Sequence, residues 1–171
     1  EAGLEHQMAP MPTMPGPEGI AGEQDRALQA MQLLPEKTRA IFTRDRPIEY
    51  REINPVNPFQ PKPSPGLRQS WIKSAGSLPD DPLVHRALLA YSSDFGLSGT
   101  SLIPHGYSLI KGDVQLASLD HALWFHRDFR FDEWLLYAME STVSYGGRGF
   151  NQGRIFKQDG TLVASVTQEG L

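Results

Sequence analysis

"ALLAYSSDFG" (Ala87–Gly96) completes an amphipathic pattern that predicts the one long helix in the second half of the chain. Before this stretch, Asp81 suits the N-cap position and Pro82 suits the first helical position. At its end, Gly96 suits the left-handed residue that commonly follows a helix. The remaining elements of the second half must therefore be arranged around this helix.

The segments on either side of the helix alternate in the way that strands do. The expected strands are residues 46–54 (RPIEYREIN), 67–76 (LRQSWIKSAG), 114–126 (VQLASLDHALWFH), 133–145 (EWLLYAMESTVSY), 148–157 (RGFNQGRIFK) and 162–170 (LVASVTQEG). The Asp159-Gly160 pair predicts a two-residue hairpin between the last two. The order predicts an α+β fold, in which an antiparallel meander is long enough to wrap around the helix.

The composition of the chain argues against several classes of function. A formal net charge of −4 gives no basic field for nucleic acid, and no apolar run approaches the ~18 residues of a membrane span. The absence of cysteine excludes disulfides and thiolate metal sites and is consistent with the cytoplasm. His121 and His126 would face opposite sides of a strand, so we expect no metal. The first residue, Glu1, suggests a piece of a longer polypeptide.

The N-terminal region has a different character. Thirteen of the 14 prolines precede Leu83, and residues 8–19 (MAPMPTMPGPEG) have the density of proline and glycine of an extended linker. Residues 23–35 (EQDRALQAMQLLP) predict a short helix that Pro35 ends. We therefore expect an interdomain linker with a short helix over residues 1–37 and one folded domain over residues 38–171.

Asp94 is in an unexpected place on the predicted helix. Its helical phase matches that of Leu83, Ala87, Ala90 and Tyr91, so it shares the stripe interpreted as apolar. It also lies in the last turn, where the helix dipole disfavours an anion by roughly 0.3–1 kcal/mol. Either the helix frays before Asp94 and water solvates it, or it is a partly buried carboxylate that needs hydrogen-bond donors.

Two polar residues could supply such donors. Strand parity places Ser118 in an apolar row of residues 114–126, and Gln168 closes an apolar row of residues 162–170. A hydroxyl donates one hydrogen bond and an amide can both donate and accept. Serine is common in strands, however, and a glutamine near a chain end is usually solvated, so spacing alone leaves their meeting open.

Other catalytic arrangements fit the sequence less well. A triad of Ser118, Asp120 and His121 is disfavoured because adjacent residues of a strand face apart, and no Gly-x-Ser-x-Gly motif is present. The glycine-rich residues 144–150 (SYGGRGF) lie between strands and do not open a helix, so they favour a β-bulge or a close backbone approach over a phosphate-binding loop. Arg148 in that segment could still meet a phosphate at a surface groove.

The segments LLAYSSDFG, LASLDHALWFHR, EWLLYAMESTVSYGGRGF and QDGTLVASVTQEG occur in an order and at a spacing that resemble the bacterial acyl-CoA thioesterase II family. The resemblance covers essentially the whole chain and corresponds to the C-terminal half of these double hot-dog enzymes, starting in their interdomain linker. It implies a hot-dog fold, an antiparallel sheet wrapped around one long helix, for residues 38–171.

The resemblance also implies a mechanism. The family's catalytic aspartate, threonine or serine, and glutamine fall on Asp94, Ser118 and Gln168, with Ser118 in place of the threonine of some relatives. These residues would activate a water molecule that hydrolyses fatty acyl-CoA to fatty acid and CoA, with no cofactor and with Arg148 as a candidate substrate-binding residue.

The family's N-terminal repeat has no counterpart in these 171 residues. We therefore expect either a homodimer or association with the missing half. Two alternatives remain open at this level: a non-catalytic module that binds acyl-CoA or serves as a scaffold, and a hot-dog dehydratase that would use His85 on the helix.

Overall fold

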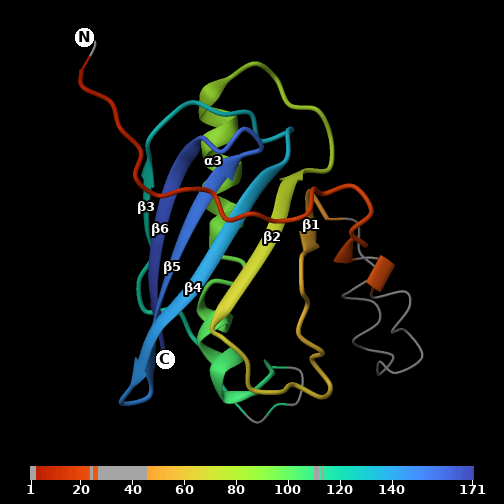
Figure 1. Ribbon diagram of the computed structural model, residues 1–171, viewed down its shortest axis with the longest axis vertical. Coiled ribbons are helices and arrows are strands. Elements are labelled where there is room, and N and C mark those ends of the chain that lie inside the picture. The colour runs from red at the N-terminus through yellow and green to blue at the C-terminus, as the bar shows by residue number, and fades with distance from the viewer. Residues whose placement is uncertain (1–2, 24, 27–45, 110–111, 113) are drawn as a thin grey trace.

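A curved antiparallel sheet lies against the long helix α3 (Pro82–Ser93) in the computed structural model (Figure 1), which describes residues 3–23, 25–26, 46–109, 112 and 114–171. The other elements are β1 (Ile48–Glu52), β2 (Leu67–Ser74), the 3₁₀-helix η2 (Ser98–His105), β3 (Ala122–Phe125), β4 (Leu135–Tyr145), β5 (Arg148–Lys157) and β6 (Leu162–Gly170). The strands follow the order β1-β2-β4-β5-β6-β3 across the sheet, with antiparallel neighbours. The predicted α+β arrangement is confirmed.

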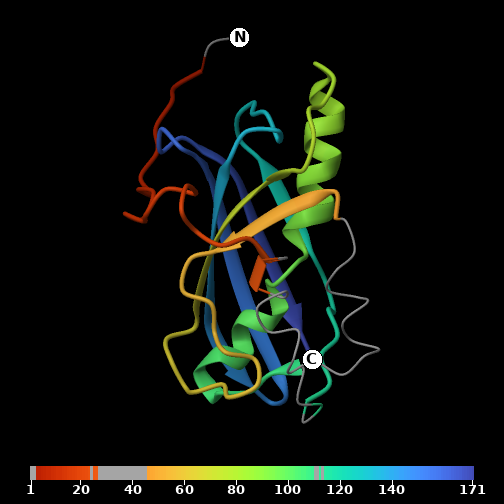
Figure 2. The ribbon, with the colours of Figure 1, turned by 90° about the vertical axis from the view of Figure 1, so that its right-hand side faces the viewer.

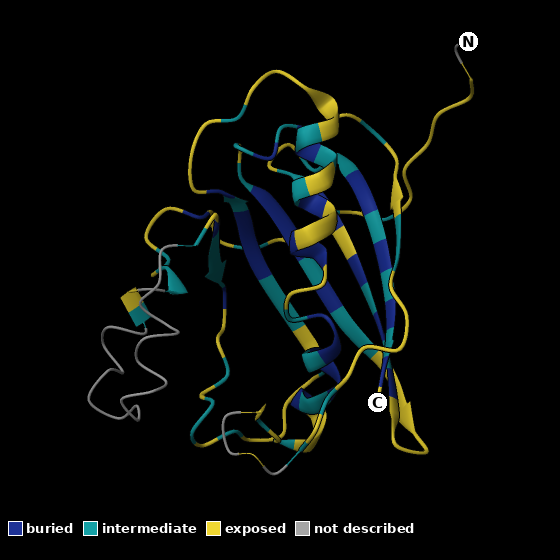
Figure 3. Cartoon of the chain, turned by 180° about the vertical axis from the view of Figure 1, so that it is seen from behind, coloured by how far each residue is buried: buried dark blue, intermediate teal, exposed yellow. Residues whose placement is uncertain are grey.

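The two faces of the sheet are covered differently. Figure 2 shows α3 on one side and the N-terminal chain on the other, and Figure 3 shows buried strand residues behind the helix. The core between sheet and helix includes Ile72, Leu89, Phe131, Tyr137, Ile155 and Val166. On the opposite face, Trp71, Leu136 and Phe156 form a second cluster with Ile53.

Residues 7–20, here called the N-terminal strap, run across that second cluster. Met11, Met14 and Ile20 pack against it, and the indole nitrogen of Trp71 donates a 2.8 Å hydrogen bond to the carbonyl of Pro15. Proline and glycine thus produce an extended segment, as predicted, and it covers apolar side chains of the sheet. The short helix expected over residues 23–34 lies mostly outside the described residues.

The ends of α3 follow the sequence signals. The Asp81 carboxylate accepts a 2.9 Å hydrogen bond from the Leu83 nitrogen, Pro82 is the first helical residue, and Gly96 has a φ of 82°. A left-handed backbone at Gly96 turns the chain from the helix into η2. Asp94 is the C-cap residue, immediately after the last helical residue.

The predicted buried face of α3 is wrong. Leu83 and Tyr91 are 70% and 55% exposed, and Asp94 shares this outward side, whereas His85, Leu89, Ser92 and Ser93 are buried. Serine was not expected inside. Its burial costs little here because Ser92 Oγ and Ser93 Oγ donate to the carbonyls of Leu89 and Ala90, one turn earlier.

The strand predicted over residues 114–126 is also shorter than expected. Only Ala122–Phe125 forms β3, and Ser118 makes an isolated bridge to Gly170. Ala122 pairs with Thr167, so residues 119–121 oppose only residues 168–169. One extra residue therefore bulges at this point.

The bulge has an identifiable cause and breaks the predicted parity. The Asp120 carboxylate accepts a 2.9 Å hydrogen bond from the Glu169 nitrogen, in place of a backbone carbonyl. Beyond the bulge, Leu123 packs against the core, and Trp124, which parity placed in the apolar row, is 52% exposed.

Glycines shape two turns between strands and one close approach of the backbone to η2. Gly146 and Gly147, with φ of 60° and 77°, turn β4 into β5, which explains the glycine-rich segment. A Cβ at Gly149 would lie 2.5 Å from Ser101 Cβ, so the expected close backbone approach is confirmed, against η2. Between β5 and β6, Gly160 is left-handed at a φ of 88° and Lys157 N donates to Thr161 O, so the hairpin is confirmed but its loop has three residues.

Candidate active site

Asp94 projects from the end of α3 with its side chain 60% exposed. Its position matches neither of the two interpretations of the sequence fully. The carboxylate is accessible to solvent on one side, and on the other Oδ1 accepts a 2.5 Å hydrogen bond from Gln168 Nε2. Asp94 is thus an accessible acid that a buried amide holds in position.

Gln168 connects the other two residues that the sequence singled out. It lies on β6 with no exposed surface, and its amide nitrogen donates to Asp94 Oδ1 and, over 2.9 Å, to Ser118 Oγ. An amide nitrogen carries two hydrogens, and these two bonds use both. The structure therefore brings Asp94, Ser118 and Gln168 together from the helix end, the bulged segment and the last strand.

Ser98 was missed by sequence reasoning. It is buried at the start of η2, and its Oγ donates a 2.7 Å hydrogen bond to Gln168 Oε1. Since Ser98 uses its only hydrogen there, the 3.2 Å contact between Ser98 Oγ and Ser118 Oγ has Ser118 as donor. The two serines thus fix which end of the amide faces Asp94.

His121 is the second missed residue. Its Nε2 lies 2.8 Å from Ser93 Oγ, and its Nδ1 lies 4.0 Å from Asp94 Oδ1. Ser93, His121 and Asp94 follow the order of a Ser-His-Asp triad, but Ser93 is fully buried and its hydroxyl donates to the carbonyl of Ala90. This serine is not accessible to a substrate and cannot be the nucleophile.

A tyrosine in the core supports the end of the helix. Tyr137 is fully buried on β4, and its hydroxyl donates a 2.6 Å hydrogen bond to the carbonyl of Ser93. Burial raises the pKa of Tyr137 well above its usual value, and the nearby charges of Tyr50 and Asp94 act in the same direction. Tyr137 therefore stays protonated and keeps donating to the backbone next to Asp94.

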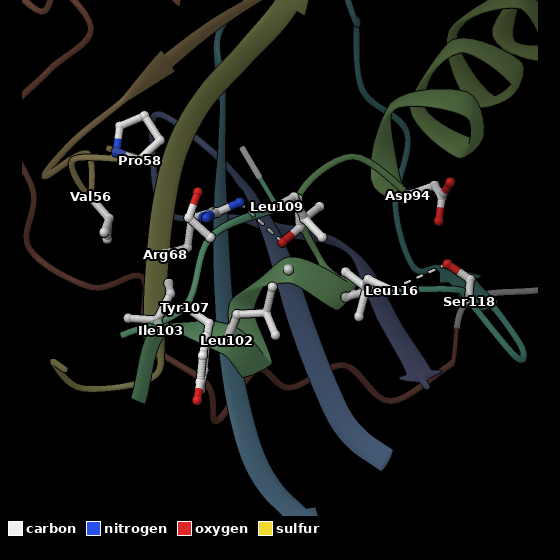
Figure 4. Close-up of a pocket in the computed structure, with 14 residues that line it drawn as sticks. Val56, Pro58, Arg68, Asp94, Leu102, Ile103, Tyr107, Leu109, Leu116 and Ser118 are labelled. Carbon is white, nitrogen blue, oxygen red and sulfur yellow. Dashed lines mark hydrogen bonds between the residues drawn. The ribbon is translucent and has the colours of Figure 1, made fainter. Parts of the chain in front are cut away.

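A cavity of about 340 Å³ opens beside these residues (Figure 4). Asp94 and Ser118 lie at one end of it, and Val56 and Pro58 lie at the other. The side chains that line the rest are mainly apolar: Leu102, Ile103, Tyr107, Leu109 and Leu116, with Arg68 as a cation. The cavity can thus hold an apolar chain that ends at the carboxylate.

Four further expectations can be compared with the structure outside this cavity. Arg148 is exposed on β5, 3.4 Å from Glu169 Oε2, and does not line the cavity. His85 is buried, and its Nδ1 accepts a 2.9 Å hydrogen bond from the Phe131 nitrogen, so it serves the core and does not support the dehydratase alternative. Within the described residues, no cluster of three metal-binding side chains occurs, and no helix has the length and apolar character to cross a membrane.

Comparisons with known proteins agree on one family. A model of the acyl-CoA thioesterase family matches residues 37–171. Acyl-CoA thioesterase 2 of Haemophilus influenzae is 41% identical over 171 residues, which is 100% of this chain and 59% of that protein. Acyl-coenzyme A thioesterase 8 of Rattus norvegicus is 36% identical over 98% of this chain and 54% of its own length.

Solved structures agree with the sequence comparisons. An acyl-CoA thioesterase II from Mycobacterium marinum is 37% identical, with a TM-score of 0.74 over 100% of this chain and 58% of that one. A protein described as having a hot-dog fold, from Alicyclobacillus acidocaldarius, has a TM-score of 0.70 at 19% identity and supports the fold alone. The chain spans somewhat more than half the length of the curated relatives it matches.

Proposed function

The chain belongs to the acyl-CoA thioesterase family, and from this premise we propose that it hydrolyses the thioester of fatty acyl-CoA, releasing fatty acid and coenzyme A. One observation carries the proposal: the buried Gln168 amide bonds both Asp94 and Ser118 at the edge of an apolar cavity. The cavity suits the acyl chain, and the polar cluster suits a water molecule that attacks the carbonyl at its end.

In this mechanism Asp94 is the general base. The water oxygen forms a bond to the thioester carbon while one of its protons passes to the Asp94 carboxylate. The tetrahedral intermediate then breaks the carbon–sulfur bond, and the thiolate of CoA receives that proton. Gln168 holds the carboxylate and Ser118 holds the Gln168 amide, so the base is fixed beside the water, which lowers the entropic part of the barrier. Water is the only co-reactant, so no cofactor is required.

A second hot-dog unit is the proposed partner. β3 pairs with β6 along one edge, and its residues Trp124 and Phe125 are 52% and 40% exposed. Tyr91 and Phe95, at the end of α3, are exposed to a similar extent. An unpaired edge beside exposed apolar side chains favours association, and the relatives have nearly twice this length. The partner is then the N-terminal repeat of a longer polypeptide or a second copy of this chain.

Three smaller proposals remain. We place the domain boundary after residue 37, with the preceding residues as the linker, and we place the protein in the cytoplasm. We assign Arg148, exposed at the β4–β5 turn, to a phosphate of CoA outside the cavity. Arg148→Ala should then raise KM for acyl-CoA and leave kcat unchanged, whereas an unchanged KM would remove this assignment.

The central experiment measures thiol release from medium- and long-chain acyl-CoAs by the intact polypeptide. Asp94→Asn removes the base and should lower kcat by about 10²–10⁴-fold. Asp128→Asn, an 84% exposed acid on the surface, is the matched control and should leave turnover unchanged. Equal rates in wild type and Asp94→Asn would overturn the role of Asp94. Binding of a nonhydrolysable analogue without any turnover would instead indicate a non-catalytic module.

A further inference from the structure

His121 contacts the end of α3 through both ring nitrogens. Its Nε2 lies 2.8 Å from Ser93 Oγ, and its Nδ1 lies 4.0 Å from Asp94 Oδ1. The His121 side chain is 25% exposed, so water reaches the ring from one side. The imidazole thus connects a fully buried hydroxyl to the accessible carboxylate.

The hydrogen bonds around Ser93 determine which nitrogen of His121 carries the proton. Ser93 Oγ donates its only hydrogen to the carbonyl of Ala90 over 2.9 Å. The 2.8 Å contact between Ser93 and His121 therefore has the ring as donor. Neutral His121 is then the Nε2–H tautomer, and the lone pair of Nδ1 faces Asp94.

The gap between His121 and Asp94 is the size of one water molecule. Atoms 4.0 Å apart are too distant for a direct hydrogen bond, but a water about 2.8 Å from each would bridge them at an angle of about 90°. Both Nδ1 and a carboxylate oxygen are acceptors, so such a water donates one hydrogen to each. Its lone pairs are left free for an electrophile.

We propose that His121 is a further catalytic residue, which accepts a hydrogen bond from the nucleophilic water while Asp94 takes the other proton. The proposal rests on the thioesterase function above. The proposal changes neither the proton transfer to Asp94 nor the release of the thiol. His121 keeps its own proton on Nε2 throughout and fixes the orientation of the water at the moment of attack.

The groups near His121 include two acids and two neutral polar side chains. Asp94 is the acid that faces the ring from the end of α3, and Asp120 precedes it in the bulge, where its carboxylate is bonded to the Glu169 nitrogen. From the sheet, β6 contributes the neutral Gln168, and β4 contributes the Tyr137 hydroxyl behind Ser93. A protonated imidazole has no acceptor, so the proposed role requires the neutral ring.

Two variants separate the two nitrogens of His121. In His121→Gln, the amide reaches the place of Nε2 and can still donate to Ser93, but the acceptor facing Asp94 is lost. In His121→Asn, the amide oxygen can accept at the place of Nδ1 without titrating. We expect His121→Gln to lower kcat about ten- to a hundredfold with KM within about twofold, the effect of one hydrogen bond to the reacting water. His121→Asn should keep more activity than His121→Gln, because it keeps an acceptor that faces Asp94.

His126 provides the matched control. Its Nε2 also bonds a serine hydroxyl, Ser165 Oγ, over 2.9 Å, but the ring follows the far end of β3 from His121. His126→Gln should leave kcat as in wild type. The proposal would be overturned if His121→Gln had the kcat of wild type. It would also be overturned if the Gln and Asn variants lost equal activity together with an equal fraction of folded protein.

A measurement independent of catalysis tests the same geometry. Nitrogen-15 NMR of the imidazoles distinguishes the two neutral tautomers. The Nε2–H form is expected for His121 in the intact wild-type polypeptide, and a mixture is expected in Ser93→Ala. An Nδ1–H form in wild type would contradict the proposal even if hydrolysis is confirmed. If wild type hydrolyses no acyl-CoA, the proposed function fails and with it the catalytic role, whereas the tautomer is still decided.

Discussion

The amide nitrogen of Gln168 lies 2.5 Å from Asp94 Oδ1, so a fully buried donor on the last strand holds an accessible acid at the end of the helix. The bond keeps the carboxylate of Asp94 in one place without shielding it from the cavity. The site is therefore sensitive to a substitution that replaces the amide nitrogen Nε2 by another atom.

Replacing that donor by an acceptor should disable the site. Gln168→Glu puts a second carboxylate against Asp94 in a position without solvent, and two such groups cannot both ionise easily. The pair then has one pKa raised above its unfolded value, so the loss of stability grows as the pH rises above about 4. We expect kcat to fall at least a hundredfold and Tm to fall more at pH 8 than at pH 5. Gln115→Glu, on an exposed residue, should change neither.

Ser98→Ala tests whether the orientation of the amide matters. Without the 2.7 Å bond from Ser98 Oγ, the buried Oε1 of Gln168 has no donor, which should cost about 1–3 kcal/mol of stability. The amide can then rotate away from Asp94, so kcat should drop about tenfold. Ser92→Ala removes another buried hydroxyl, bonded only within α3, and should lower Tm slightly without affecting turnover. Unchanged kcat in Ser98→Ala would show that Gln168 does not need this bond.

The sequence predicted which three residues lie together more accurately than it predicted the surfaces around them. Asp94, Ser118 and Gln168 were found because each interrupts or ends an apolar row, and the resemblance joined them. The face of α3 was predicted the wrong way round, because Ser92 and Ser93 satisfy their hydroxyls locally and so can be buried. The polarity of Ser92 and Ser93 therefore did not indicate whether their side chains are exposed.

Ser98 and His121 could not be found from periodicity. Ser98 lies in a 3₁₀-helix whose short sequence has no repeat of 3.6 residues, and His121 lies in a bulge that shifts the strand register. That bulge depends on the Asp120 side chain bonding the Glu169 backbone, a contact between segments 49 residues apart. Strand parity predicts the wrong face wherever a side-chain hydrogen bond replaces a backbone hydrogen bond between two strands.

An acid outside the candidate active site should make folding depend on pH. Two bonds from the Arg130 guanidinium, and one from the Leu78 nitrogen, lower the pKa of Asp132 to about 2. A carboxyl whose pKa is lowered by folding stabilises the fold at pH values above its pKa in the unfolded chain, about 4. This contribution is lost as the pH falls toward 2. Asp132→Asn should therefore lower Tm at pH 7 and reduce the further loss between pH 5 and pH 2.5. A parallel decline of both proteins in thermal unfolding across that range would contradict this.

Gly153 links the packing of the sheet to the active site. It lies on β5, where a Cβ would overlap Tyr137 Cε2 and come within 2.7 Å of Val166 Cγ1. Gly153→Ala should destabilise the protein by about 1–3 kcal/mol, the usual cost of overpacking a core. Since the Tyr137 hydroxyl holds the carbonyl of Ser93 beside Asp94, displacement of this ring should also lower kcat. Gly76→Ala, where no atom lies within 4 Å of the added carbon, is the control and should change neither Tm nor kcat. Loss of stability in Gly153→Ala with full kcat would show that Asp94 keeps its position without support from the Tyr137 ring.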